Sequence, residues 1–214
     1  MLMNFIKKEK FKQLKSALVD LLLIPSIRLF LGEKKLKSIQ DIENFINKRS
    51  AHITQGTLYG YLRTRIGVRY VALFQDEVFL QSINIARWNI FSVATQDLIN
   101  YIFSYLYTFQ NFRDFEELKK IYKNILLEQK KNGLTADIIE KSLLDYEKKF
   151  NEINWSNYYK KDPFKNSSYA LFYWSPIADE LKELDKEIVI NSMQLKWKNI
   201  AEEFRELIQP ISKI

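Results

Sequence analysis

Apolar residues recur every three or four positions along most of this chain, which is the spacing of one face of an α-helix. The central segment, 76–109, is apolar almost all round, with uncharged polar residues between, and this is typical of a helix buried on most sides. The pattern predicts helices over residues 8–24, 27–31, from 39 onward, 76–109, from 115 to about 131, from 136 to about 150, and from 176 to about 209.

The predicted ends of these helices carry the residues that begin or stop helices. Proline cannot continue a helix interior, so Pro25 should end the first one. Ser38 followed by Asp41 resembles a capping box, and Asn132-Gly133 is a typical C-terminal pair. Further predicted starts lie at Asp114, at Thr135 and at Ser175-Pro176.

Two stretches interrupt the helical pattern. Residues 50–70 hold three of the five glycines and read as less regular. Residues 154–174, rich in aromatic and polar side chains, read as a long loop. Such a long connection is uncommon, so we expect either a packed cover or a functional segment.

Low glycine and proline content, with five and four residues, argues against a β-sandwich or barrel. The expected fold is therefore all-α, a single-domain irregular or orthogonal bundle of six or seven helices. The 214 residues suit one domain, in which we expect a basic N-terminal third, 1–75, to pack on a helical body, 76–214.

The chain has no cysteine and one histidine, His52. Disulfides and thiolate sites are therefore excluded, and we expect no metal and no cofactor. The longest uncharged stretch, 98–112, is shorter than the roughly 20 residues of a membrane span. No cleavage site follows the basic and apolar residues at the start, so the expected location is cytoplasmic.

Positive charge is concentrated at the start of the chain. The net charge is +7, yet residues 1–75 hold 14 basic and 5 acidic residues, whereas the remainder has a small acidic excess. A basic region of this size suits an anionic partner such as nucleic acid or an acidic surface. Solubility alone is an equally good explanation from composition.

Arginine replaces lysine in one part of a lysine-rich chain. No lysine occurs between Arg49 and Glu117, where all six cations are arginine. Guanidinium groups bind carboxylate or phosphate with two hydrogen bonds. One interpretation is an anion site built from Arg63, Arg65 and Arg69, with tyrosines alongside that can stack on bases. The alternative is a set of buried structural ion pairs, for instance with Asp76, Glu77 or Asp97.

The segment 51–65, AHITQGTLYGYLRTR, resembles the helix-turn-helix of TetR-type transcriptional regulators. The likeness lies in the Gly-Thr-Leu-Tyr run and the basic pair after it, with His52 at the position of the family's turn glycine. Family members are also all-α. The resemblance implies DNA contacts, and with the arginine cluster the candidate contact residues are Gln55, Thr57, Tyr59, Tyr61, Arg63, Arg65 and Arg69.

No nucleophile elbow, phosphate loop or dinucleotide fingerprint is present. We therefore expect a binding protein rather than an enzyme, with an anionic partner that meets the basic N-terminal third, DNA being the most concrete case. A membrane-surface or complex-assembly protein is the alternative. A further alternative is an esterase-like hydrolase that uses His52 as a base.

Overall fold

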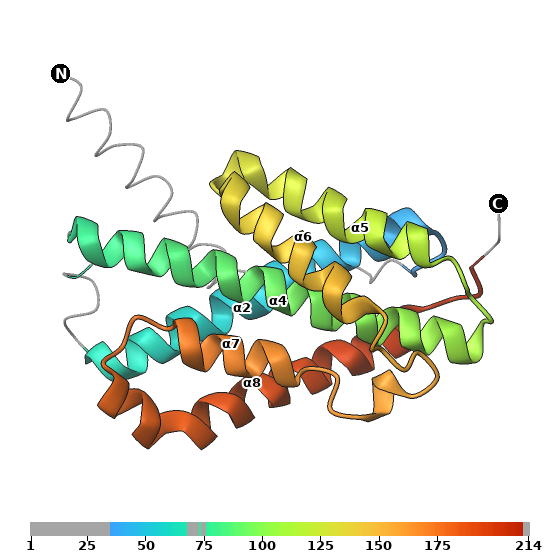
Figure 1. Ribbon diagram of the computed structural model, residues 1–214. Helices are drawn as coiled ribbons and strands as arrows, with labels where there is room; N and C mark the ends of the chain where they lie inside the picture. Colours follow the sequence, from blue (N-terminus) through green and yellow to red (C-terminus); the bar gives the residue numbers. More distant parts are fainter. Residues whose placement is uncertain (1–34, 68–72, 74–75, 212–214) are drawn as a thin grey trace. The chain divides into compact units, whose positions relative to one another are not determined.

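The computed structural model describes residues 35–67, 73 and 76–211 (Figure 1). The chain divides into two compact units, Met1–Lys35 and Leu36–Ile214. All the elements described below belong to the second unit. The helices predicted over 8–24 and 27–31 lie outside the described residues.

The second unit is a helical bundle, which confirms the all-α prediction. The described residues form six α-helices, two short 3₁₀ turns and no strand longer than an isolated bridge. In chain order these elements are α2 (Ile39–Ile66), α4 (Glu77–Phe109), α5 (Phe115–Glu128), η2 (Gln129–Asn132), α6 (Ala136–Phe150), η3 (Tyr158–Lys160), α7 (Lys165–Trp174) and α8 (Asp179–Leu207).

The long helix α4 runs through the middle of this bundle (Figure 1). Helices α2, α5, α6 and α7 all pack against it, and α8 packs on α2 and α7. Residues from Ile90 to Leu106 are buried on almost every side of α4. This matches the prediction from a segment that is apolar all round.

Local capping chemistry determines several helix ends as predicted. The Ser38 hydroxyl accepts from the Asp41 backbone N–H at 3.1 Å, and Asp41 accepts from the Ser38 hydroxyl in return. The Asp76 and Asp114 carboxylates accept from backbone N–H groups in the first turns of α4 and α5. Gly133, with φ of 101°, ends the α5–η2 segment in a conformation that side chains disfavour.

The prediction of irregular structure over 50–70 is wrong for its described part, because α2 continues without a break to Ile66. Ile53, Leu58 and Leu62 are buried at helical spacing, and this burial outweighs the glycines within the helix. A helical glycine costs only about 0.5–1 kcal/mol. The helix ends at Gly67, whose φ is 62°.

The prediction of a loop over 154–174 is wrong for residues 158–160 and 165–174. This segment contains η3 and α7, and α7 packs between α4 and α8. Ser175 does not open the last helix, because its hydroxyl donates to the Leu171 carbonyl at the end of α7, and α8 begins at Asp179. Of the two expectations for this segment, the packed cover is the one that the structure shows.

The start of α2 and the end of α8 meet. The Leu36 N–H donates to the Leu207 carbonyl and the Gln209 N–H donates to the Leu36 carbonyl, both at 3.0 Å. Together with the packing of α2 on α4 and α8, this places α2 in the same unit as residues 76–211. No boundary of the fold therefore falls at residue 75. Within the part of the chain described, every helix is too short or too polar to span a bilayer.

Candidate functional site

The predicted contact residues lie on one uninterrupted helix. A helix-turn-helix needs a turn near His52, but His52 lies half-buried inside α2, which is helical from Ile39 to Ile66. The turn that the TetR-type resemblance implies is therefore absent, and the two-helix geometry of that motif does not form here. The physical reason is the continuous buried face of α2, which favours one helix over two.

The seven candidate residues do not share one surface. Thr57 is buried and its hydroxyl donates to the Ile53 carbonyl at 2.6 Å, so it cannot reach a partner. Gln55 and Tyr59 are half-buried. Arg63 is exposed, and the side-chain ion pairs and hydrogen bonds found among the described residues do not include it. Arg69 lies outside the described residues.

Tyr61 and Arg65 bind the same carboxylate. The Arg65 guanidinium donates through Nε and a terminal nitrogen to both oxygens of Asp185 on α8. The Tyr61 hydroxyl donates to Asp185 at 3.0 Å. Hydrogen bonding to Arg65 holds the pKa of Asp185 below its ordinary value, and burial with the Asp185 contact raises the pKa of Tyr61 to about 12. These three side chains connect α2 to α8.

A second pair joins the same two helices nearer the start of α2. Arg49 forms an ion pair with Glu203 of α8, and its guanidinium lies 5.6 Å from the Phe45 ring. The alternative interpretation of the arginines as structural pairs thus holds for Arg49 and Arg65. For these two arginines the carboxylates come from α8, from Glu203 and Asp185.

Two further arginines of the lysine-free stretch contact aromatic rings. The Arg87 guanidinium lies 4.2 Å from the Trp88 ring, and burial lowers the Arg87 pKa. Arg113 lies 3.4 Å from the Tyr107 ring and donates to the Tyr107 carbonyl at 2.6 Å. A planar cation suits such stacking better than an ammonium group does. The preference for arginine in this stretch therefore has a structural explanation at four of six positions.

The most unusual polar group in the bundle is the Asp97 carboxylate on α4. It is 1% exposed and forms none of the ion pairs among the described residues. The Ser167 backbone N–H donates to it at 2.7 Å, the Asn166 side chain at 3.1 Å and the Tyr158 hydroxyl at 3.4 Å. Burial raises its pKa from 3.8 to about 6, although these donors act in the opposite direction.

Asp97 caps α7 from a distance in the sequence. Ser167 is in the first turn of α7, where backbone N–H groups have no partner within the helix. The helix dipole adds a favourable interaction with the carboxylate. The Ser167 hydroxyl in turn accepts from the Trp197 indole at 2.9 Å, and Trp197 stacks on Phe164 with ring centroids 4.5 Å apart. The cluster thus holds α4, α7 and α8 together.

Other uncharged polar residues of α4 make similar connections. Asn100 accepts from the Tyr146 hydroxyl of α6 at 2.8 Å, and Gln96 donates to the Tyr122 hydroxyl of α5 at 2.8 Å. Ser104 donates to the Trp155 carbonyl at 2.7 Å. Burial raises the pKa of both tyrosines, so they remain neutral donors. These contacts join the helices of the bundle core by hydrogen bonds.

One feature of the sequence distinguishes Asp97. It is the only acidic residue between Glu77 and Asp114. The identity of its donors could not be read from sequence, because they come from a segment that reads as a loop. Across the described ranges, no three side chains of His, Cys, Asp or Glu come together as a metal site. No protein-family model, curated protein or solved structure matches the chain.

Proposed function

We propose that this chain is a helical binding protein that associates with the phosphate groups of nucleic acid through its basic N-terminal third, residues 1–75. The observation that carries the proposal is the charge distribution. Residues 1–75 hold 14 basic and 5 acidic residues, whereas the rest of the chain holds slightly more acidic than basic residues. The Coulomb attraction of such a region for a polyanion does not depend on a particular fold motif.

Some of these basic residues are paired with carboxylates inside the protein and are not available to a partner. Arg49 and Arg65 are neutralised by Glu203 and Asp185. On α2, Lys48 and Arg63 remain exposed. Residues 1–35 alone contain eight basic and three acidic residues, so they supply most of the uncompensated charge. The proposed contacts are therefore to phosphate groups, without base readout by a recognition helix.

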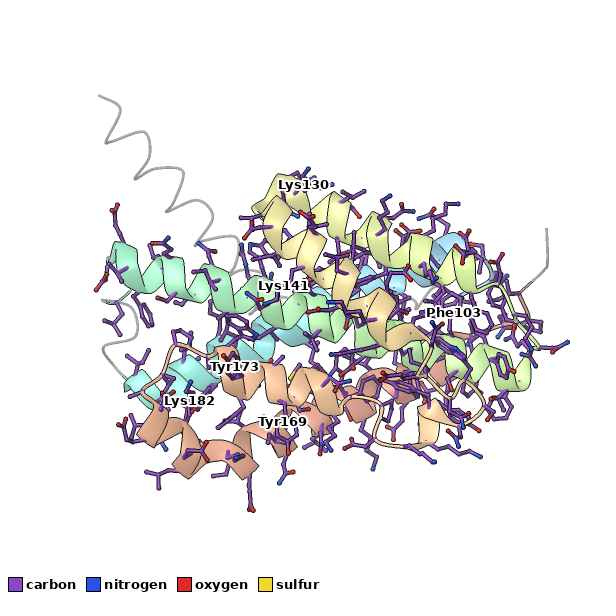
Figure 2. The ribbon with its side chains drawn as sticks, viewed as in Figure 1. Phe103, Lys130, Lys141, Tyr169, Tyr173 and Lys182 are labelled. Carbon is purple, nitrogen blue, oxygen red and sulfur yellow. The ribbon has the colours of Figure 1, made fainter. Side chains whose placement is uncertain are left out.

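The proposal is tested by fluorescence anisotropy with labelled single-stranded and duplex DNA at several salt concentrations. In one variant Lys10, Lys12 and Lys15 become Gln. In the matched control Lys130, Lys131 and Lys141 become Gln; Lys130 and Lys141 lie on the α5–α6 hairpin (Figure 2). The first variant should reduce the salt slope of binding by about 0.7–0.9 for each phosphate group that the protein no longer neutralises. The control should bind like the unmodified chain. Equal effects of the two variants, or no binding at low salt, would contradict the proposal.

An anionic membrane surface is a second candidate, favoured by the order of residues in the first 24 positions. Lys7, Lys8, Lys10, Lys12 and Lys15 precede the mostly apolar run 17–24. Basic residues beside apolar ones favour anionic lipid headgroups. Flotation with vesicles of phosphatidylcholine and phosphatidylserine distinguishes the two candidates. Binding that requires phosphatidylserine, with no DNA binding at the same salt concentration, would select the membrane.

A further inference from the structure

One face of α8 exposes large aliphatic side chains between Leu181 and Leu195. Leu184, Ile188 and Leu195 are 76%, 72% and 65% exposed, and Leu181 beside them is 41% exposed. In Figure 1, α8 lies along one edge of the bundle, with α7 and α2 on its inner side. A single exposed leucine is ordinary, but four at regular spacing on one helix face form an apolar patch.

This apolar stripe, Leu181, Leu184, Ile188 and Leu195, lies on the side of α8 away from the core. The buried face of α8 alongside contains Val189, Met193 and Trp197. At about 100° per residue, the centres of the two faces are about 150° apart. The spacing of three, four and seven residues places the stripe at the a and d positions of a heptad pattern, which is typical of a helix that pairs with another helix.

Charges at the two ends of the stripe indicate how a partner helix would run. Glu180 and Lys198 are both exposed, and among the described residues neither forms an ion pair. They are about five helical turns apart, so they lie on the same side of α8, about 27 Å from each other. In the antiparallel register that faces Leu184 with Leu195 of the other copy, each Glu180 lies within about one residue of Lys198 of that copy. A parallel pair would place like charges opposite each other.

We propose that the apolar stripe of α8 binds the same stripe of a second copy of this chain in an antiparallel two-fold pair. In this register Leu184 packs against Leu195 of the second copy, Ile188 packs against Asn191, and Leu181, at the end of the stripe, lies opposite Lys198. Each layer occurs twice because the interface is symmetric. Asn191, exposed at a d position, lies near the two-fold axis, where a polar residue fixes the register of a helix pair.

Sedimentation equilibrium of the full chain measures the oligomeric state. We expect a species of twice the 25.6 kDa monomer mass, in equilibrium with monomer. Changing both Leu184 and Leu195 to Glu should weaken the association at least tenfold, because each layer would then bury two carboxylates. The control is Val78→Glu, since Val78 is equally exposed but lies on α4. Its association constant should match that of the unmodified chain.

Reversing charges tests the antiparallel orientation. Glu180→Lys and Lys198→Glu should each weaken the dimer, whereas the double variant should restore it, because the pair is only exchanged. The chain has no cysteine, so single cysteines can also report the register. A mixture of Leu184→Cys and Leu195→Cys chains should form a mixed disulfide faster than either chain forms one with itself.

Several outcomes would overturn the proposal. The proposed dimer is excluded if the full chain remains monomeric at high concentration. A monomer is also the expected result if another part of the same chain covers the stripe of α8. A dimer that the double Glu variant leaves intact assigns the interface to another surface. Faster disulfide formation between two Leu184→Cys chains than in the mixture would show a parallel pair, which also contradicts the proposed interface.

Discussion

Asp185 on α8 accepts two hydrogen bonds from the Arg65 guanidinium on α2, and Tyr61, one turn earlier, donates a third. Arg63, two residues before Arg65, is exposed on a different side of the same helix. The two arginines therefore have different roles although they belong to one sequence cluster. Their difference provides a direct test of which charges stabilise the fold.

We expect Arg65→Ala to lower the midpoint of thermal unfolding and Arg63→Ala to leave it within about 2 °C. Removing Arg65 leaves the buried Asp185 carboxylate with the Tyr61 hydroxyl as its one remaining side-chain donor. Differential scanning calorimetry of both variants makes the comparison. Since Arg65 holds the pKa of Asp185 below its ordinary value, the stabilisation is present at neutral pH and is lost as the pH falls through that lowered pKa. Equal midpoints for the two variants would exclude a structural role for the pair.

Asp97 should make the folded state more stable on mild acidification. Its pKa rises from 3.8 to about 6 on folding, so the folded state binds the proton more tightly. The resulting stabilisation is complete below pH 3.8 and is lost as the pH rises through about 6. The difference corresponds to roughly 3 kcal/mol, at about 1.4 kcal/mol per pH unit.

Urea unfolding between about pH 4.5 and 8 measures this effect. Asp97→Asn should remove the part of the pH dependence that Asp97 contributes, because the amide does not titrate, while its carbonyl can still accept from the Ser167 N–H. Asp97→Ala should instead lose stability across the whole range, because the first turn of α7 loses its cap. An unchanged pH profile in Asp97→Asn would mean that Asp97 is ionised in the native state throughout.

Replacing Gly60 or Gly133 by alanine should change the free energy of unfolding in opposite directions. Gly60 is exposed inside α2 and an added Cβ meets nothing within 4 Å, so Gly60→Ala should stabilise the chain by about 0.5–1 kcal/mol. Gly133 has φ of 101°, and Gly133→Ala should cost about 1–2 kcal/mol through backbone strain. Chemical denaturation of both variants measures the sign of each change in the free energy of unfolding. A stabilising Gly133→Ala would contradict the left-handed end of η2.

The buried hydrogen bond between Tyr146 and Asn100 should be costly to break. Tyr146→Phe removes the donor and leaves the Asn100 amide oxygen unsatisfied in the core, which should cost about 1–3 kcal/mol. Tyr173→Phe is the matched control, because Tyr173 is mostly exposed on α7 (Figure 2), and it should change stability by less than about 0.5 kcal/mol. Similar losses in both variants would show that the Asn100 bond contributes little.

Features that depend on neighbouring residues could be read from the sequence. The Ser38 cap, the start of α5 after Asp114 and the turn at Gly133 each need only a few consecutive residues, and all three are correct. The all-α class follows from apolar spacing in the same way. Local chemistry decides these features before any tertiary contact forms.

The features that sequence reasoning missed depend on distant residues. Helix α7 has no side-chain cap of its own, since its first turn uses Asp97 from α4. The role of Arg65 depends on Asp185, which is 120 residues away in the sequence. No local pattern distinguishes an arginine with such a partner from an exposed one such as Arg63. The fold class is therefore accessible from sequence, whereas the function of individual arginines is not.

The backbone hydrogen bonds between Leu36 and the Leu207–Gln209 segment have a consequence for folding kinetics. Residues 36 and 207 are far apart in the sequence, so bringing them together costs much chain entropy. The chain loses this entropy before the contacts between its two ends can stabilise the folded state. The contacts between α5 and α6 are local in the sequence, so we expect this hairpin to form early. Helices α2 and α8 come from opposite ends of the described unit, so we expect them to dock late in folding. Substitutions at their interface should therefore accelerate unfolding more than they slow folding.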